Sequence, residues 1–260
     1  MATRTSSRNI YSYSKGPRIF VLGLMASLSS CKPSSVASRD VATAPALASS
    51  SELVPGLPQG PLQNAFCELI SKKNPGSLVG CYPMDGNAGD GSSLGNHGQI
   101  KGAVQFSKLG TSEFAAFTGG FIQIPKNSSL PKENDARTFA LWIYTEKGSW
   151  KMDEHTILHS GGFLLGPRKT FAIDMHTSPQ MQISIWDNDF FFEPKVALEG
   201  WFHLSAVYDP SSRKMRAYVN GEFIGTKDDV KALETPDMDY FIGSSKDGKF
   251  PFLGKIDDLL

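Results

Sequence analysis

The fold is decided by Met215-Arg-Ala-Tyr-Val-Asn-Gly-Glu-Phe-Ile224 and by four phrases around it. Two short apolar runs flank Asn220-Gly221, a dipeptide that tolerates positive φ, so the stretch predicts a β-hairpin with a two-residue turn. Each of the other phrases is also a short apolar or aromatic run, with turn residues nearby. They are Thr138-Phe-Ala-Leu-Trp-Ile-Tyr144, Trp201-Phe-His-Leu-Ser-Ala-Val-Tyr-Asp209, Tyr240-Phe-Ile-Gly243 and Phe252-Leu-Gly-Lys-Ile-Asp-Asp258. This pattern is typical of an antiparallel sandwich.

The composition supports the same fold class. The 260 residues include 17 Phe, 7 Tyr and 4 Trp together with 25 Gly and 16 Pro, so aromatic strands with many reversals are expected. The 26 Lys and Arg residues balance the 26 Asp and Glu residues, and no basic stripe stands out. The sequence therefore gives no indication of nucleic-acid binding.

In this order the five phrases resemble the laminin-G-like jelly-roll domain of the concanavalin A-like superfamily. The resemblance extends from about Leu78 to Leu260 and implies an antiparallel jelly-roll β-sandwich. Leu78–Asp85 is expected to form the first strand, and Phe114–Pro125 two strand segments around a Gly119-Gly120 reversal. The final strand is shorter than the family pattern, so it is expected to be short or truncated.

The first 62 residues have the character of a targeting segment followed by a linker. A basic start and the apolar run Ile19–Leu28 precede Leu28-Ser-Ser-Cys31, which resembles a bacterial lipobox with Cys31 as the lipidated residue. Residues 1–30 are then a lipoprotein-type signal peptide, and the Ser-, Ala- and Pro-rich residues 31–62 a disordered tether to the domain at 63–260. An ordinary cleaved signal peptide, leading to secretion, or an organelle transit peptide is the alternative.

The remaining cysteines are Cys67 and Cys81. If Cys31 carries lipid and the chain is exported to an oxidising compartment, these two form a candidate disulfide. Two buried free thiols are the alternative. A short helix or a packed lead-in is expected over Leu62–Lys72, around Cys67.

Residues for catalysis are not apparent, so we expect a protein that is not an enzyme. Glycoside hydrolases of this sandwich flank the scissile bond with two carboxylates, which alternate along one strand. Asp153-Glu154 and Asp257-Asp258 are adjacent pairs, whose side chains would face opposite sides of a strand. The five histidines follow no ligand spacing.

A structural calcium ion is the cofactor that the resemblance implies, near the place where the first and last strands meet. On that basis the candidate ligands are Asp85 and Asp258, with Asn87 as a third. Calcium takes six to eight oxygen ligands, which such loops can supply. The alternative is that these residues only shape turns.

The candidate ligand-binding residues are Trp186, Asp187 and Asn188, with Trp150 in a second loop that also holds His155. A flat aromatic face beside hydroxyl-binding groups suits a sugar ring. Alternatively, Trp186 caps the expected core strand Phe190–Phe192, as Trp142 and Trp201 are expected to pack inside theirs. By resemblance we expect a lipid-anchored module of the cell envelope or surface that binds a glycan. A protein-interaction or adhesion module is the alternative, and the membrane is expected to be contacted through the lipid alone.

Overall fold

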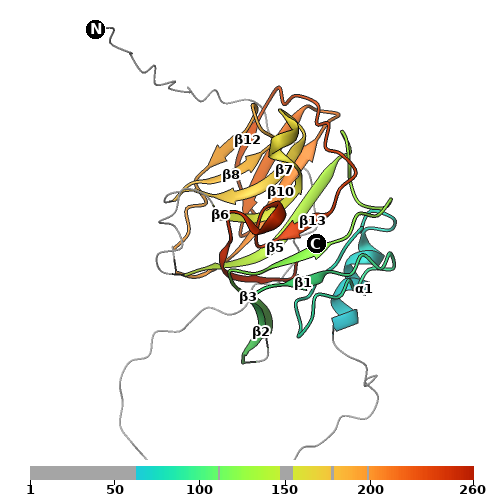
Figure 1. Ribbon diagram of the computed structural model, residues 1–260, viewed down its shortest axis with the longest axis vertical. Helices are drawn as coiled ribbons and strands as arrows, with labels where there is room; N and C mark the ends of the chain where they lie inside the picture. Colours follow the sequence, from blue (N-terminus) through green and yellow to red (C-terminus); the bar gives the residue numbers. More distant parts are fainter. Residues whose placement is uncertain (1–62, 111, 147–154, 177–178, 198) are drawn as a thin grey trace, which may run out of the picture. The chain divides into compact units, whose positions relative to one another are not determined.

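The computed structural model describes residues 63–110, 112–146, 155–176, 179–197 and 199–260, and these form an all-β sandwich. Figure 1 shows two antiparallel sheets stacked face to face, with one short helix outside them. The first sheet has the strand order β1-β4-β13-β6-β7-β8-β9, and the second has the order β12-β11-β10-β5-β14-β3-β2. The predicted jelly-roll class is confirmed.

The strands are short, as the sequence predicts. The first sheet contains β1 (Gln99–Lys101), β4 (Phe121–Ile124), β6 (His155–Gly161), β7 (Thr170–Met175), β8 (Met181–Ser184), β9 (Phe190–Phe192) and β13 (Tyr240–Ile242). The second contains β2 (Val104–Leu109), β3 (Ser112–Thr118), β5 (Arg137–Thr145), β10 (Trp201–Asp209), β11 (Lys214–Val219), β12 (Glu222–Lys227) and β14 (Leu253–Asp257). The remaining described elements are α1 (Gln63–Lys73) and the 3-10 turns η2 (Phe163–Leu165) and η3 (Lys246–Gly248).

Alternation along the strands builds the core between the sheets. In β10 every second residue is buried, which places Phe202, Leu204, Ala206 and Tyr208 inside and their neighbours on the outer face. Aliphatic and aromatic side chains of both sheets fill the space between them. In this packing the hydrophobic effect stabilises the fold by about 25 cal/mol for each Å² of apolar surface removed from water.

Local turn signals are confirmed where they are strongest. Asn220 and Gly221 have φ values of 50° and 79° and join β11 to β12, with Val219 opposite Glu222. The Gly119-Gly120 reversal joins β3 to β4, but these two strands belong to different sheets. A Cβ on Gly120 would come within 2.4 Å of the backbone nitrogen of Ala103, so this crossing requires glycine.

A disulfide ties α1 to residues 78–85, the lead-in segment of the sandwich. Cys67 in α1 is bonded to Cys81, with the two Cα atoms 5.9 Å apart, which confirms the candidate pair over the alternative of two free thiols. The predicted helix is also confirmed, as α1. Buried Asp90 organises the loop that follows, since its carboxylate accepts the backbone N–H groups of Cys81, Ser92 and Asn96 at 2.8–2.9 Å.

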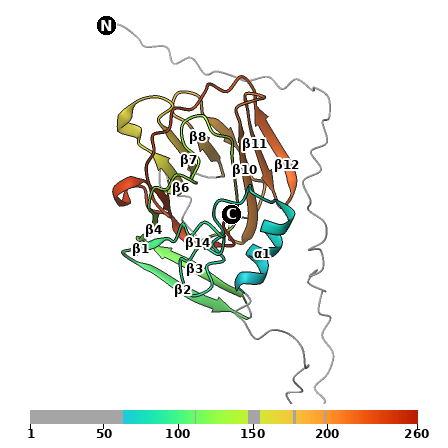
Figure 2. The same ribbon diagram turned by 90° about the vertical axis from the view of Figure 1, so that its right-hand side faces the viewer.

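The prediction of a full first strand over Leu78–Asp85 is wrong. Only Tyr82 pairs, in an isolated antiparallel bridge with Leu259. The reason is that β3 already occupies that side of β14, so residues 78–85 pair with the last part of the chain only at Leu259. In Figure 2 the segment that follows α1 accordingly lies beside the C-terminus. The last strand itself is short, five residues, and is paired on both sides, with β3 and with β5.

Candidate binding site at the rim of the sandwich

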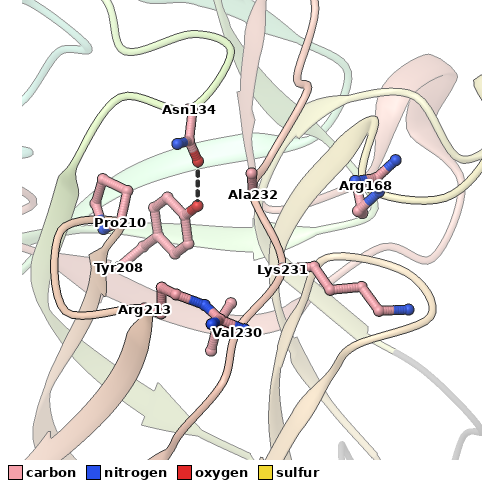
Figure 3. Close-up of a pocket in the computed structure, with 8 residues that line it drawn as sticks. All are labelled: Asn134, Arg168, Tyr208, Pro210, Arg213, Val230, Lys231 and Ala232. Atoms are coloured by element: carbon pink, nitrogen blue, oxygen red, sulfur yellow. Dashed lines mark hydrogen bonds between the residues drawn. The ribbon is translucent and has the colours of Figure 1, made fainter.

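A pocket of about 380 Å³ lies where connections at one end of the sandwich meet. It opens to solvent, and Figure 3 shows the residues that line it. They come from the β4–β5 connection, the β6–β7 connection, the end of β10, the β10–β11 turn and the segment between β12 and β13. The lining consists of Asn134, Arg168, Tyr208, Pro210, Arg213, Val230, Lys231 and Ala232.

Tyr208 fixes the centre of the pocket. Its side chain is almost fully buried because β10 points it inward, and its hydroxyl donates a hydrogen bond to Asn134 Oδ1. The same hydroxyl and the same amide oxygen both accept from the backbone N–H of Leu233, at 3.1 and 3.0 Å. This network ties the β12–β13 segment to the β4–β5 connection, so the pocket is shaped by buried polar groups that already have partners.

The turn nominated from the sequence adjoins this pocket. Asp187 Oδ1 is 3.0 Å from the ammonium group of Lys231, and Asn188 Oδ1 accepts the backbone N–H of Lys231 at 2.9 Å. On the other side, the carbonyl of Trp186 accepts a hydrogen bond from the backbone N–H of Arg168 at 3.3 Å. Trp186, Asp187 and Asn188 therefore adjoin one wall of the pocket. The side chains of Asp187 and Asn188 are bound to Lys231, which forms part of that wall.

Trp186 is held half exposed in this turn. It has a φ of 46° and Asp187 a φ of 77°, a conformation that L-residues adopt only when their surroundings impose it. The preceding Ile185 is fully buried while the indole is 39% exposed. The interpretation of Trp186 as a core residue is therefore wrong, whereas Phe190 and Phe192 do form the expected buried strand.

Three cations line the pocket, and among the described residues no acidic one does. Each cation is paired with an acidic side chain that is not among the lining residues: Arg168 with Glu234 at 2.6 Å, Lys231 with Asp187 at 3.0 Å and Arg213 with Asp229 at 3.5 Å. Glu234 is also paired with Lys169 at 2.6 Å. The two cations lower the pKa of the Glu234 carboxyl, chiefly through the hydrogen bond from Lys169.

A second group of polar residues lies where the lead-in segment meets the last strand. Burial, then Asp258 and Asp85, raise the pKa of Asp257 to about 8, and burial with Asp85 raises that of Asp258 to about 6. Asp85 has a raised pKa as well, from burial and from Glu113. The structure thus brings the two principal candidate calcium ligands, Asp85 and Asp258, into electrostatic contact.

This carboxylate junction fits a hard cation only in part. Within the described ranges, no three His, Cys, Asp or Glu side chains gather closely enough to hold a metal ion. The third candidate, Asn87, is exposed, and its amide oxygen accepts the N–H of Gly89 at 2.7 Å while its amide nitrogen donates to the carbonyl of Asp85. Asn87 has the geometry of a turn-forming residue.

Other nominated residues have different positions from those expected. Trp150 and Cys31 lie outside the described residues. His155 is fully buried in β6 and does not belong to a ligand-binding loop. Trp142 is 38% exposed on the outer face of the second sheet, against His203, so its assignment to the core is wrong. Trp201 is half-buried and packs against Phe114 and Tyr144 on the same face.

The sequence analysis missed the pocket's own lining. Arg168, Arg213 and Lys231 stand on three different connections and share no motif. The one signal in the sequence was the turn residues beside two of them, Gly166-Pro167 and Pro210-Ser211-Ser212. In the structure Arg168 and Arg213 both have positive φ in these turns, at 63° and 54°. In the described part of the chain, no helix has the length and apolar character needed to cross a membrane.

Comparison with solved structures finds the same fold in binding domains. Domain 4 of AbnA, an extracellular arabinanase from Geobacillus stearothermophilus solved in complex with arabinotriose, aligns with a TM-score of 0.51 and 18% identity, over 70% of this chain and 90% of that one. The botulinum neurotoxin serotype G binding domain aligns with a TM-score of 0.54 and 14% identity, over 70% of this chain and 46% of that one. The serotype D binding domain is similar, with a TM-score of 0.53, 15% identity and the same coverages.

At these identities the likeness shows the fold alone, and the chain spans slightly less than half of each toxin domain. No curated protein sequence matches the chain. The family model for the concanavalin A-like lectin/glucanases superfamily matches residues 117–260, which is more than half of the sequence. The chain therefore belongs to the concanavalin A-like lectin/glucanases superfamily.

Proposed function

We propose that this protein is a non-catalytic binding module that recognises a glycan at the rim pocket beside Trp186. The observation that carries the proposal is an open pocket with polar walls, where the backbone of Arg168 is hydrogen-bonded to that of Trp186, a half-exposed aromatic residue. Sugar rings bind to flat aromatic faces through their C–H groups and to nearby polar groups through their hydroxyls. The arabinanase domain, solved with arabinotriose, supports a sugar ligand for this fold by analogy.

A glycan array followed by calorimetric titration tests the proposal. Trp186→Ala should weaken binding of any retained sugar about two- to tenfold, in line with the ~0.5–1.5 kcal/mol assigned to a well-placed aromatic contact. Trp142→Ala is a matched control, because the two indoles are 38% and 39% exposed but lie on different parts of the fold. Failure of every sugar to bind, or equal effects of the two substitutions, contradicts the proposal.

A protein-interaction or adhesion module is the second candidate. It is favoured by the apolar side chains that the second sheet exposes on its outside, where Trp142 and Phe223 are 38% and 57% exposed. Exposed aromatic groups of this kind are enriched in protein interfaces. If the array finds no sugar and a captured protein partner is lost on Trp142→Ala or Phe223→Ala, this second function replaces the first.

For the location of the module we propose the cell envelope or cell surface, with the chain anchored by lipid on Cys31. The support is the lipobox-like Leu28-Ser-Ser-Cys31 and the disulfide between Cys67 and Cys81, a bond that persists in oxidising compartments. Mass spectrometry of the mature protein should find a lipid-modified Cys31 as the first residue. An unmodified first residue other than Cys31 contradicts the anchor and indicates secretion.

We also propose that a calcium ion binds at the carboxylate junction, through Asp85 and Asp258 with backbone carbonyls and water. The support is that burial, and then a neighbouring carboxylate (Glu113 for Asp85, Asp85 for Asp258), raises the pKa of both groups, and a bound divalent cation would favour their charged forms. When bound, the ion would supply a structural link between the lead-in segment and the last strand. A thermal midpoint that is the same in calcium and in chelator contradicts this site.

A further inference from the structure

We propose that the rim pocket accepts the anionic group of an acidic sugar, a carboxylate or a sulfate, so that the glycan ligand is acidic. This inference rests on the proposed function and specifies its ligand class. The first observation is the sign of the lining: Arg168, Arg213 and Lys231 contribute side chains, and no Asp or Glu from the described part of the chain lines the pocket. A concave surface lined by one sign of charge concentrates ligands of the opposite sign.

The cations stand on both sides of an apolar strip in the pocket, with one arginine on each side. In Figure 3, Val230–Ala232 runs through the middle, with Arg213, Tyr208 and Pro210 on one side and Arg168 and Lys231 on the other. Pro210, Val230 and Ala232 supply apolar surface between the charges. An arginine fork forms two parallel hydrogen bonds with the oxygens of a carboxylate or a sulfate, which a neutral hydroxyl cannot match.

The existing ion pairs leave the arginines able to bind a further anion. Arg213 Nη2 lies 3.5 Å from Asp229, whose side chain is 88% exposed, and such surface pairs contribute little. Arg168 holds Glu234 through Nη2, and Lys169 holds the other oxygen of the same carboxylate. Each guanidinium has five N–H donors, so one acidic partner does not exhaust it.

The same contacts identify substitutions that leave the fold intact. Arg213→Gln leaves no buried carboxylate without a partner, because the Asp229 side chain is exposed to solvent. Arg168→Gln leaves Glu234 paired with Lys169. Lys214→Gln is the matched control: it removes one positive charge from the residue next to Arg213, but Lys214 pairs with Asp228 at 2.9 Å and does not line the pocket.

The experiment compares acidic and neutral forms of the same sugar by calorimetric titration of the full chain. One arm uses oligogalacturonate and its methyl ester, and the other a sulfated galactan oligosaccharide and its desulfated form. We expect at least one acidic form to bind about tenfold or more tightly than its neutral partner, the gain typical of a charge-assisted hydrogen bond. Whichever arm shows the difference identifies carboxylate or sulfate as the anion. Arg213→Gln and Arg168→Gln should each remove most of that preference, and Lys214→Gln should keep it.

Several results overturn the inference. One is equal binding of the acidic and neutral forms in both arms. Another is a preference for the acidic form that survives Arg213→Gln and Arg168→Gln, or that Lys214→Gln reduces equally. Neutral sugars that bind through Trp186 would leave the proposed function standing while removing the acidic ligand. Absence of binding to every sugar would remove both. Thermal unfolding of each variant establishes that it is folded before titration.

Discussion

Replacing both cysteines of the disulfide, in the variant Cys67→Ala/Cys81→Ala, should destabilise the domain substantially. The two residues are 14 apart, so the bond closes a loop of about 15 residues in the unfolded chain. In the chain-entropy model this loop corresponds to about 3 kcal/mol of stabilisation at 25 °C. Both residues are buried, at 1% and 0% exposure, so truncation to alanine removes packed sulfur atoms and adds to the loss.

Urea denaturation of the oxidised protein, the reduced protein and the double variant measures this loss. For a domain of about 200 residues, 3 kcal/mol corresponds to a fall of roughly 6–12 °C in the thermal midpoint. Reduced wild type should lie close to the double variant, because both lack the cross-link. Equal stabilities of oxidised and reduced wild type, or two thiols that react with a labelling reagent in the oxidised unfolded chain, would refute the disulfide and restore the alternative of free cysteines.

Three further predictions concern the carboxylate junction, a buried histidine and the hairpin turn. In the presence of a chelator, the free energy of unfolding should fall as pH rises from about 4 to about 8, because the folded chain holds protons on Asp257 and Asp258 that the unfolded chain has released. Asp257→Asn should reduce this pH dependence of the thermal midpoint, and an unchanged dependence contradicts the prediction. Burial, and then Lys246, lower the pKa of His159 to about 4, so the protein should lose stability through this residue as pH falls from about 6.5 towards 4. His159→Gln should remove this part of the loss of stability in acid, and a variant that loses as much stability as wild type would count against the prediction. Gly221→Val places a β-branched residue at a φ of 79° and should lower the free energy of unfolding by about 1–2 kcal/mol in urea, whereas no loss would show that the turn tolerates it.

Local signals in the sequence predicted the strands well. Asn220-Gly221 specifies its turn through backbone conformations that these two residues adopt, and the alternation in Trp201–Asp209 specifies which residues face the core. These features need no knowledge of distant residues. Leu78–Asp85 was wrong as a strand because pairing is not local. Its hydrogen-bonding partner depends on β3, which occupies most of the same edge of β14.

The candidate site was predicted less well for a related reason. An aromatic residue in a strand is equally compatible with the inner and the outer face, so Trp142 was assigned to the core although it is 38% exposed. Trp186 was singled out as a ligand candidate because polar residues surround it in the sequence, and the structure shows it half exposed. Arg168, Arg213 and Lys231 stay apart in the sequence and meet only through the jelly-roll connections, so no spacing rule reveals them.

The most direct test of the account is calorimetric titration of the full chain with the tightest sugar from a glycan array, beside Trp186→Ala and Trp142→Ala. The account predicts measurable binding that Trp142→Ala retains and that Trp186→Ala weakens about two- to tenfold. No binding to any sugar, or equal loss in the two variants, would contradict the placement of a glycan site at the rim pocket.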